Sequence, residues 1–261
     1  MFAYMFGMDL DQPDACARTL KARGIGAVVA TPTPAVAEAC ARHGLALYAC
    51  AGALSIAGRA DIKPCLDVYG QPRVWFGSGC PNDPALLETR LEQAERLAKT
   101  PGLAGIFLDG ARFASPASAE GPEAFYTCFC PHCAEQAEAL GLDWSRTGEG
   151  LRRFAAGEDA LPPAAWLAFR SRCAGQVMAR FRETFRAANP DLKLGAFVFA
   201  ASLGGLVGQT AQACAGFDIL APMLYRRYPA KHGPACLNHE YAALLRLLEP
   251  GAAPAKARVK A

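Results

Sequence analysis

Three cysteines near the middle of the chain have a spacing that suits metal binding. Cys128, Cys130 and Cys133 form a C-x-C-x-x-C pattern, so three thiolates can point at one centre while the chain turns into a helix. Thiolate sulfur in a tetrahedral arrangement favours zinc, with an iron–sulfur cluster as the competing case. The spacing therefore predicts a metal centre, and zinc is the first choice.

A closed zinc site needs a fourth ligand, and Cys80 is the best candidate. It ends an irregular stretch in which glycine and proline flank it on either side. His132 is the alternative, although it stands between two of the other ligands. Four sulfur ligands leave no open coordination position for an activated water, so we expect the zinc to be structural.

The same residues allow a different hypothesis, a thiol redox protein. The segment from Cys130 to Cys133 is also a C-x-x-C motif, which in thioredoxin-like proteins follows an early strand and opens a helix. Here a third cysteine precedes the motif, and the motif lies far into a larger chain. A redox protein would form a reversible disulfide between Cys130 and Cys133 and would bind no metal.

Strand-like and helix-like segments alternate along the chain, which predicts an α/β fold with a parallel sheet. The expected strands are 2–8, 27–30, 45–50, 103–109, 192–199 and 217–225. The expected helices are 15–23, 34–43, 84–99, 163–188, 206–215 and 236–248. Six strands, where a complete barrel has eight, predict a (β/α) TIM-barrel-like domain that is incomplete or irregular.

Two long excursions interrupt this alternation. We expect a single barrel-like domain over residues 1–250, with excursions at 52–82 and 111–162 and a disordered tail at 251–261. The first excursion is predicted to contain a β-hairpin that turns at residues 69–72. The second carries the cysteine pattern just after the fourth strand, so the zinc knuckle should stand above the barrel.

Active sites of barrels lie at the carboxyl ends of the strands, and polar residues follow several of the predicted strands. These residues are Asp9, Asp109, Arg112, Tyr225 and Arg226. Asp109 closes a strongly apolar strand, where an ionised carboxylate is costly unless it is paired or faces a polar cavity. We therefore expect Asp109 to be catalytic and the arginines and tyrosine to bind substrate.

Some of these residues have a second interpretation. Arg112 could form a structural ion pair with Asp109 and anchor the loop. Asp9 is the expected carboxylate partner in catalysis, but it could equally cap a helix. Trp75, in the first excursion, is predicted to form part of the wall against which a sugar ring stacks.

Composition excludes several classes of partner. The chain has 261 residues, a net charge of +3 and a hydrophobic share of 52%. Its lysines and arginines are scattered, so we expect neither nucleic acid nor a membrane surface as a partner. The absence of a leader-like or membrane-spanning segment predicts a cytoplasmic protein, in which eleven cysteines would stay reduced. A small carbohydrate ligand is expected, and a homo-oligomer is left open.

The order of these motifs resembles a known family. A single cysteine, a long gap and then C-x-C-x-x-C after the fourth strand is similar to the zinc cluster of family 42 β-galactosidases. The segments 80–84 and 105–113 and the Trp166-x-x-Phe169-Arg170 motif resemble TIM-barrel proteins grouped as glycosyl hydrolases. The resemblance implies a glycoside hydrolase-like protein that acts on or binds a carbohydrate. The family has Asn-Glu where this chain has Leu108-Asp109, and its nucleophile is a Glu on a seventh strand that the sequence pattern does not show. The missing nucleophile favours the alternative, a non-catalytic carbohydrate-binding relative.

Overall fold

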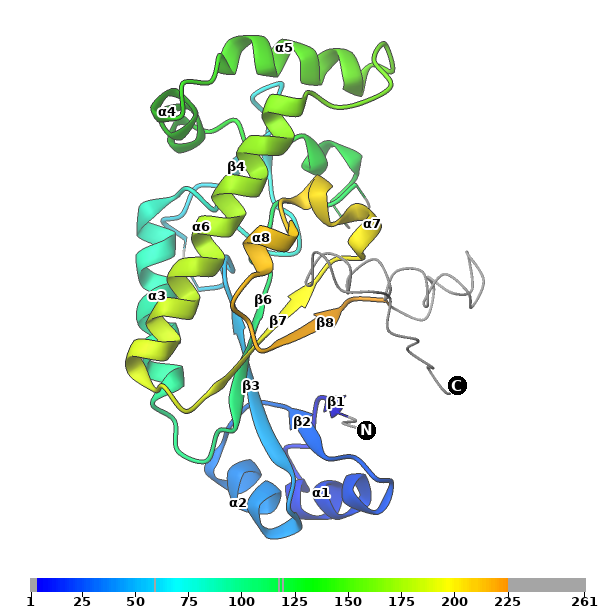
Figure 1. Cartoon of the computed structure of the whole chain (residues 1–261), viewed down its shortest axis with the longest axis vertical. Coiled ribbons are helices and arrows are strands. Elements are labelled where there is room, and N and C mark those ends of the chain that lie inside the picture. The colour runs from blue at the N-terminus through cyan, green and yellow to red at the C-terminus, as the bar shows by residue number, and fades with distance from the viewer. Residues whose placement is uncertain (1–3, 59, 117, 119, 225–261) are drawn as a thin grey trace.

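A computed structural model describes residues 4–58, 60–116, 118 and 120–224. Six parallel strands form one sheet in the order in which they follow along the chain. They are β1 (Tyr4–Phe6), β2 (Ala27–Val29), β3 (Ala46–Gly52), β6 (Gly105–Asp109), β7 (Lys193–Val198) and β8 (Ile219–Pro222). Because each strand pairs with the next, the sheet winds in one direction and curls into a half-barrel (Figure 1). The predicted α/β, incomplete-barrel class is confirmed at this level.

Helices cover one face of the sheet. They are α1 (Pro13–Ala22), α2 (Pro34–His43), α3 (Pro84–Ala98) and α6 (Ala164–Ala188). Local signals fix their ends, as α2 illustrates: the Thr33 hydroxyl accepts a hydrogen bond from the Val36 N–H at 3.2 Å, and Gly44 ends the helix with φ 64°. A capping hydroxyl at the start and a left-handed glycine at the end are the signals that the sequence displays. The predicted bounds of α2 agree with the structure.

The opposite, concave face of the sheet is packed with aromatic rings. The ring centre of Phe107 lies 5.5 Å from that of Tyr48 and 4.9 Å from that of Phe197. Glycine is required beneath them, because a Cβ at Gly195 would lie 2.5 Å from the Phe107 ring. Side chains alternate between faces along a strand, so Asp109 belongs to the same concave face as Phe107.

The first excursion contains the predicted hairpin, formed by β4 (Cys65–Leu66) and β5 (Pro72–Arg73), which pair antiparallel. Asp67, fully buried, holds its turn. The Asp67 carboxylate accepts hydrogen bonds at 2.9 Å from the backbone N–H groups of Tyr69 and Gln71, and a third at 2.8 Å from Arg73 Nε. These contacts fix the conformation of the hairpin, which lies beside the cysteines.

The second excursion is more ordered than the sequence pattern suggested. It contains a 3-10 helix η1 (Pro122–Tyr126) and the helices α4 (Pro131–Ala139) and α5 (Trp144–Ala155). Figure 1 shows α4 and α5 above the amino-terminal end of α6, beyond the edge of the sheet. The cysteine-bearing segment therefore belongs to a small helical layer that α6 connects back to the barrel.

One predicted helix is wrong. The segment 206–215 was expected to be continuous, but the structure has α7 (Ala201–Gly204), a 3-10 helix η2 (Gly205–Val207) and α8 (Ala211–Cys214). Gly208 breaks the run with φ 86°, and a Cβ there would lie 2.5 Å from the Arg170 carbonyl oxygen. The predicted helix 236–248 and tail 251–261 lie outside the described residues. No described helix is long and apolar enough to cross a bilayer.

Candidate functional site

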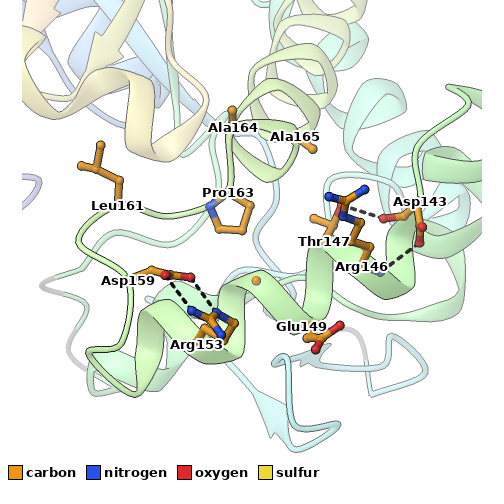
Figure 2. Close-up of a pocket in the computed structure, with 11 residues that line it drawn as sticks. Asp143, Arg146, Thr147, Glu149, Arg153, Asp159, Leu161, Pro163, Ala164 and Ala165 are labelled. Carbon is orange, nitrogen blue, oxygen red and sulfur yellow. Dashed lines mark hydrogen bonds and ion pairs between the residues drawn. The ribbon is translucent and has the colours of Figure 1, made fainter.

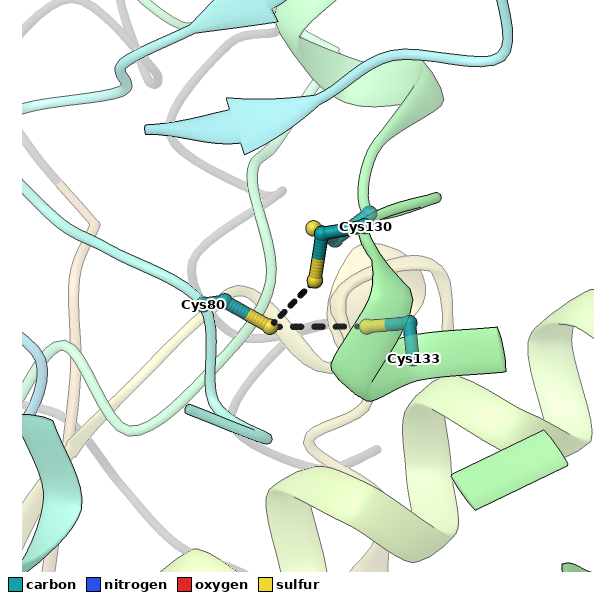
Figure 3. A group of neighbouring side chains, drawn as sticks. Cys80, Cys130 and Cys133 are labelled. Atoms are coloured by element: carbon teal, nitrogen blue, oxygen red, sulfur yellow. Dashed lines mark hydrogen bonds between the residues drawn. The ribbon is translucent and has the colours of Figure 1, made fainter. Parts of the chain in front are cut away.

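The four predicted metal ligands come together. The Sγ atoms of Cys80, Cys128, Cys130 and Cys133 all lie within 4.8 Å of one another, and all four side chains are buried. Figure 3 shows Cys80 facing two of its partners, with Sγ–Sγ distances of 3.4 Å to Cys133 and 3.5 Å to Cys130. His132 is not a member of the group. Cys80 is therefore the residue that completes the set.

The spacing of the sulfur atoms fits a single tetrahedral ion. With Zn–S bonds of about 2.3 Å, the edges of a regular tetrahedron are about 3.8 Å long. The observed separations bracket this value, so small side-chain rotations would bring four thiolates onto one ion. The donor set is all sulfur, which suits a soft or borderline metal ion.

Local structure explains how the knuckle is shaped. Cys130 is the N-cap of α4, Pro131 occupies its first turn, and the Cys133 N–H donates to the Cys130 carbonyl at 3.0 Å. The Phe129 N–H donates to the Leu66 carbonyl at 2.8 Å, which ties the knuckle to the hairpin. Both Cys130 and Cys133 thus lie at a helix N-terminus, where the backbone dipole favours negatively charged sulfur.

Asn82 is a residue that the sequence analysis missed. Its backbone N–H donates to Cys80 Sγ at 3.3 Å, and its side-chain Nδ2 donates to Cys133 Sγ at 3.2 Å. Donors of this kind stabilise a thiolate and orient it toward a metal ion. Its position two residues after Cys80 is the only sequence signal that could have indicated this role.

A fifth cysteine, Cys65 of β4, lies against the ligand group and is 1% exposed. Hydrogen bonds from Cys130 and the other surrounding thiols hold the pKa of Cys128 well below its usual range. The hydrogen bond with Cys128 raises the pKa of both Cys65 and Cys80. The thiols are thus strongly coupled to one another through their hydrogen bonds. No ligand-like spacing in the sequence pointed to Cys65.

Asp109, the predicted catalytic carboxylate, lies half-buried at the carboxyl end of the central strand β6. Its backbone carbonyl accepts a hydrogen bond from the Ala53 N–H at 2.8 Å, which fixes the strand end. Across residues 4–224 as described, the Asp109 carboxylate makes no hydrogen bond or ion pair. Partial enclosure, and then the Asp109 charge, raise the pKa of the neighbouring Cys50 thiol to about 12.

Asp9, the expected partner of Asp109, is exposed and already engaged. Its Oδ1 accepts hydrogen bonds from the N–H groups of Asp11 at 2.9 Å and Gln12 at 3.2 Å, in a turn that leads into α1. Neighbouring strands are about 4.8 Å apart, so the three steps from β1 to β6 span roughly 14 Å along the sheet. Its catalytic role stays a prediction.

The predicted substrate-binding residues are divided between the buried interior and the undescribed segment. The Arg112 guanidinium donates to the Phe113 carbonyl at 2.9 Å and lies 4.8 Å from the ring centre of Trp75. The Trp75 ring is 2% exposed, so little of it is available to a ligand. Tyr225 and Arg226 lie outside the described residues.

A separate pocket of about 540 Å³ lies between α5 and the start of α6 (Figure 2). Arg153 crosses it to form two hydrogen bonds with the Asp159 carboxylate, both at 3.1 Å. The Asp143 carboxylate caps α5 by accepting from the Arg146 N–H at 2.9 Å. Arg153 and Asp159 are thus paired with each other, and none of the predicted site residues lines the pocket.

The fold is similar to those of solved glycoside hydrolases. The PgaB (BpsB) glycoside hydrolase domain from Bordetella bronchiseptica matches with a TM-score of 0.66 and 16% identity, covering 95% of this chain and 81% of that one. A β-galactosidase from the Antarctic haloarchaeon Halorubrum lacusprofundi matches with a TM-score of 0.61 and 17% identity, covering 90% and 42%. Gan42B, a GH42 β-galactosidase from G. stearothermophilus, matches as its E323A mutant with a TM-score of 0.52 and 11% identity, covering 76% and 36%.

These likenesses establish a shared barrel-type fold. The chain spans less than half the length of the two β-galactosidases. No protein-family model matches the sequence. No curated protein matches it either.

Proposed function

We propose that this protein is a glycoside hydrolase-like barrel that acts on a small carbohydrate and is stabilised by a zinc ion bound to four cysteines. One observation carries the proposal: Asp109, a half-buried carboxylate without a partner among the described residues, stands at the carboxyl end of the central strand of a fold similar to those of glycoside hydrolases. Active sites of barrel enzymes are built at that end of the sheet.

Asp109 is the proposed catalytic carboxylate. A partly enclosed carboxyl group can protonate a leaving oxygen in its acid form or attack an anomeric carbon in its ionised form. Hydrolysis needs a second carboxyl group, about 5 to 5.5 Å away for retention or about 6.5 to 9.5 Å for inversion. Asp9 is the proposed second group, and this role requires it to come closer to Asp109 than the roughly 14 Å that separates their strands along the sheet.

The zinc is proposed to act as a cross-link, held by Cys80, Cys128, Cys130 and Cys133. It would join the end of the first excursion to the start of α4, two segments that are about 50 residues apart in the sequence. Sulfur atoms within 4.8 Å of one another favour one ion over an iron–sulfur cluster, which divides the four cysteines among two or four irons and so holds their sulfurs farther apart.

A non-catalytic carbohydrate-binding role is the second candidate. It is favoured by Asp9, whose carboxylate is exposed and occupied by two backbone N–H groups. If Asp109 has no carboxylate partner, it can still hydrogen-bond a sugar hydroxyl. Such a protein would bind an oligosaccharide without cleaving it.

The experiment is a screen of aryl glycosides and oligosaccharides with the wild-type protein and Asp109→Asn. The proposal expects product formation by the wild type and a loss of about 10³-fold or more in the variant, since a missing general acid or nucleophile removes most of the rate enhancement. Asp61→Asn, an acid in the first excursion, serves as the control for the amide substitution.

Two outcomes count against hydrolysis. Full activity of Asp109→Asn on a substrate found in the screen would remove Asp109 from catalysis. Calorimetric binding of an oligosaccharide without turnover would support the non-catalytic candidate.

Elemental analysis of the same protein, purified without added metal, tests the zinc. A disulfide between Cys130 and Cys133 and no metal would favour the redox hypothesis.

A further inference from the structure

A positively charged side chain is buried beside the cysteines. Arg170, in the second turn of α6, is 0% exposed, although a guanidinium is always charged in proteins. Its Nη1 donates to the Phe125 carbonyl at 3.1 Å and its Nη2 to the Ala114 carbonyl at 2.5 Å. A charge in such a place costs several kcal/mol unless an opposite charge lies near it.

No carboxylate of the described residues supplies that opposite charge. The buried carboxylates of the described residues are Asp67 and Asp83, and both have other partners. Asp67 binds Arg73, and Asp83 accepts the N–H groups of Ala85 and Leu86 at the start of α3. In the described part of the chain, no ion pair involves Arg170, and its Nε has no hydrogen-bond acceptor.

Aromatic rings surround the guanidinium and connect it to the cysteines. It lies 4.1 Å from the ring centre of Trp166, 4.9 Å from that of Phe113 and 5.0 Å from that of Phe125. Cation–π contacts offset part of the desolvation cost, but rings carry no net charge. Phe113 packs in the same apolar cluster as Cys65 and the four cysteines of the candidate metal site. The guanidinium and the sulfur atoms therefore share one low-dielectric interior.

The thiolate centre has the charge that is missing. A divalent ion with four thiolates carries a net charge of about −2. Burial lowers the pKa of Arg170 and the neighbouring Arg112 lowers it further, whereas negative charge on Cys65, Cys128 and Cys133 acts in the opposite direction. Thiols must lose their protons to coordinate a metal ion, so metal binding brings this negative charge to the centre.

We propose that the Arg170 guanidinium is the counter-charge of the metal–thiolate centre formed by Cys80, Cys128, Cys130 and Cys133. Metal binding and the burial of Arg170 then stabilise each other, and Trp166-x-x-Phe169-Arg170 is part of the metal site. This inference rests on the zinc in the proposed function, and it is independent of any catalytic activity.

The test compares zinc affinity in wild-type protein, Arg170→Met and Arg170→Lys, measured by competition with a chelator. Removing the charge is expected to weaken zinc binding about 10- to 100-fold, the effect typical of losing a residue that supports a metal ligand. Arg170→Lys keeps the charge and is expected to bind zinc more tightly than Arg170→Met. Arg182→Met is the matched control, since Arg182 is on the same helix and also donates to a backbone carbonyl, that of Ala215.

A second measurement separates this role from packing. The stability of each variant is measured by denaturant unfolding with and without bound zinc, and Co²⁺ absorption verifies that four thiolates still coordinate. The proposal expects Arg170→Met to lose more stability in the zinc-bound form than in the metal-free form. Equal losses in both forms, with unchanged zinc affinity, would show a packing role only and overturn the inference.

The remaining outcomes are also decisive. If Arg170→Met fails to fold, Arg170→Lys alone tests the charge: retained zinc affinity supports the inference, whereas a loss of 10-fold or more contradicts it. If the wild type itself binds no zinc, the zinc in the proposed function fails, and the counter-charge inference fails with it. Zinc binding by the wild type with identical affinity in Arg170→Met removes the inference alone.

Discussion

The cysteine region and the strand-end edge differ in how their residues are held. The four sulfur atoms of the candidate metal site lie within 4.8 Å of one another, and helix α4, the hairpin and Asn82 fix their positions. At the strand ends, Asp109 has no described partner and Asp9 belongs to a surface turn. Structural centres are held rigidly by many contacts, whereas groups that must meet a ligand keep bonding capacity unused. The following predictions test this contrast.

The largest effect is expected from removing one ligand. Cys133→Ser should lower the free energy of unfolding in the presence of zinc by more than about 3 kcal/mol, because the binding energy of a structural zinc is part of the folding energy. Urea unfolding with and without zinc measures it. Cys173→Ser is the control, since Cys173 is buried in the same cluster but is not a ligand. Equal losses in the two variants would show that the cysteines are merely apolar packing.

A smaller effect is expected at the hairpin. Asp67→Asn should cost about 3 kcal/mol, because it breaks a buried pair and leaves Arg73 without its partner. The same exchange at Asp83 should cost less than about 1 kcal/mol, because asparagine also caps helices well. Thermal unfolding of both variants gives the comparison. A loss at Asp67 no larger than at Asp83 would mean that the hairpin is not the support of the cysteine region.

The cysteine site could be predicted from sequence because its information is local. Three ligands fall within six residues, and glycine and proline mark Cys80 as the end of a turn. Helix α2 was equally accessible, since Thr33 and Gly44 bound it. Features that depend on packing between distant parts of the chain could not be predicted. The break at Gly208 serves contact with the Arg170 carbonyl, and an arginine inside a helix pattern usually signals an exposed face, not a buried charge.

At the strand ends, too, the sequence predicted only what a local pattern encodes. The sequence placed Asp109 correctly at the end of a buried strand, because an apolar run ending in an acid is a local pattern. Which residues lie opposite it depends on the curl of the sheet and on strand order, which no local pattern encodes. The occupied turn at Asp9 and the proximity of Cys50 to Asp109 therefore became visible only in three dimensions.

The concave face offers a prediction of intermediate size. Gly195→Ala should cost about 1 to 3 kcal/mol, because the new Cβ would lie 2.5 Å from the Phe107 ring in a packed interior. Gly205→Ala, where a Cβ meets nothing within 4 Å, should be neutral or slightly stabilising. Chemical denaturation measures both, and zinc content should be unchanged in each. A loss of zinc from Gly195→Ala would show that the two regions are not independent.

The smallest effect, and the sharpest contrast with Asp67, is expected from Asp109→Asn. The exchange removes one charge and no described hydrogen bond, so the free energy of unfolding should change by less than about 0.5 kcal/mol. A slight gain is the expected sign, because a partly enclosed carboxylate without a partner costs stability and is kept for a ligand. Denaturant unfolding near neutral pH measures the change. A loss of unfolding free energy as large as that of Asp67→Asn would show that Asp109 has a structural role, and the two regions would then not differ in this respect.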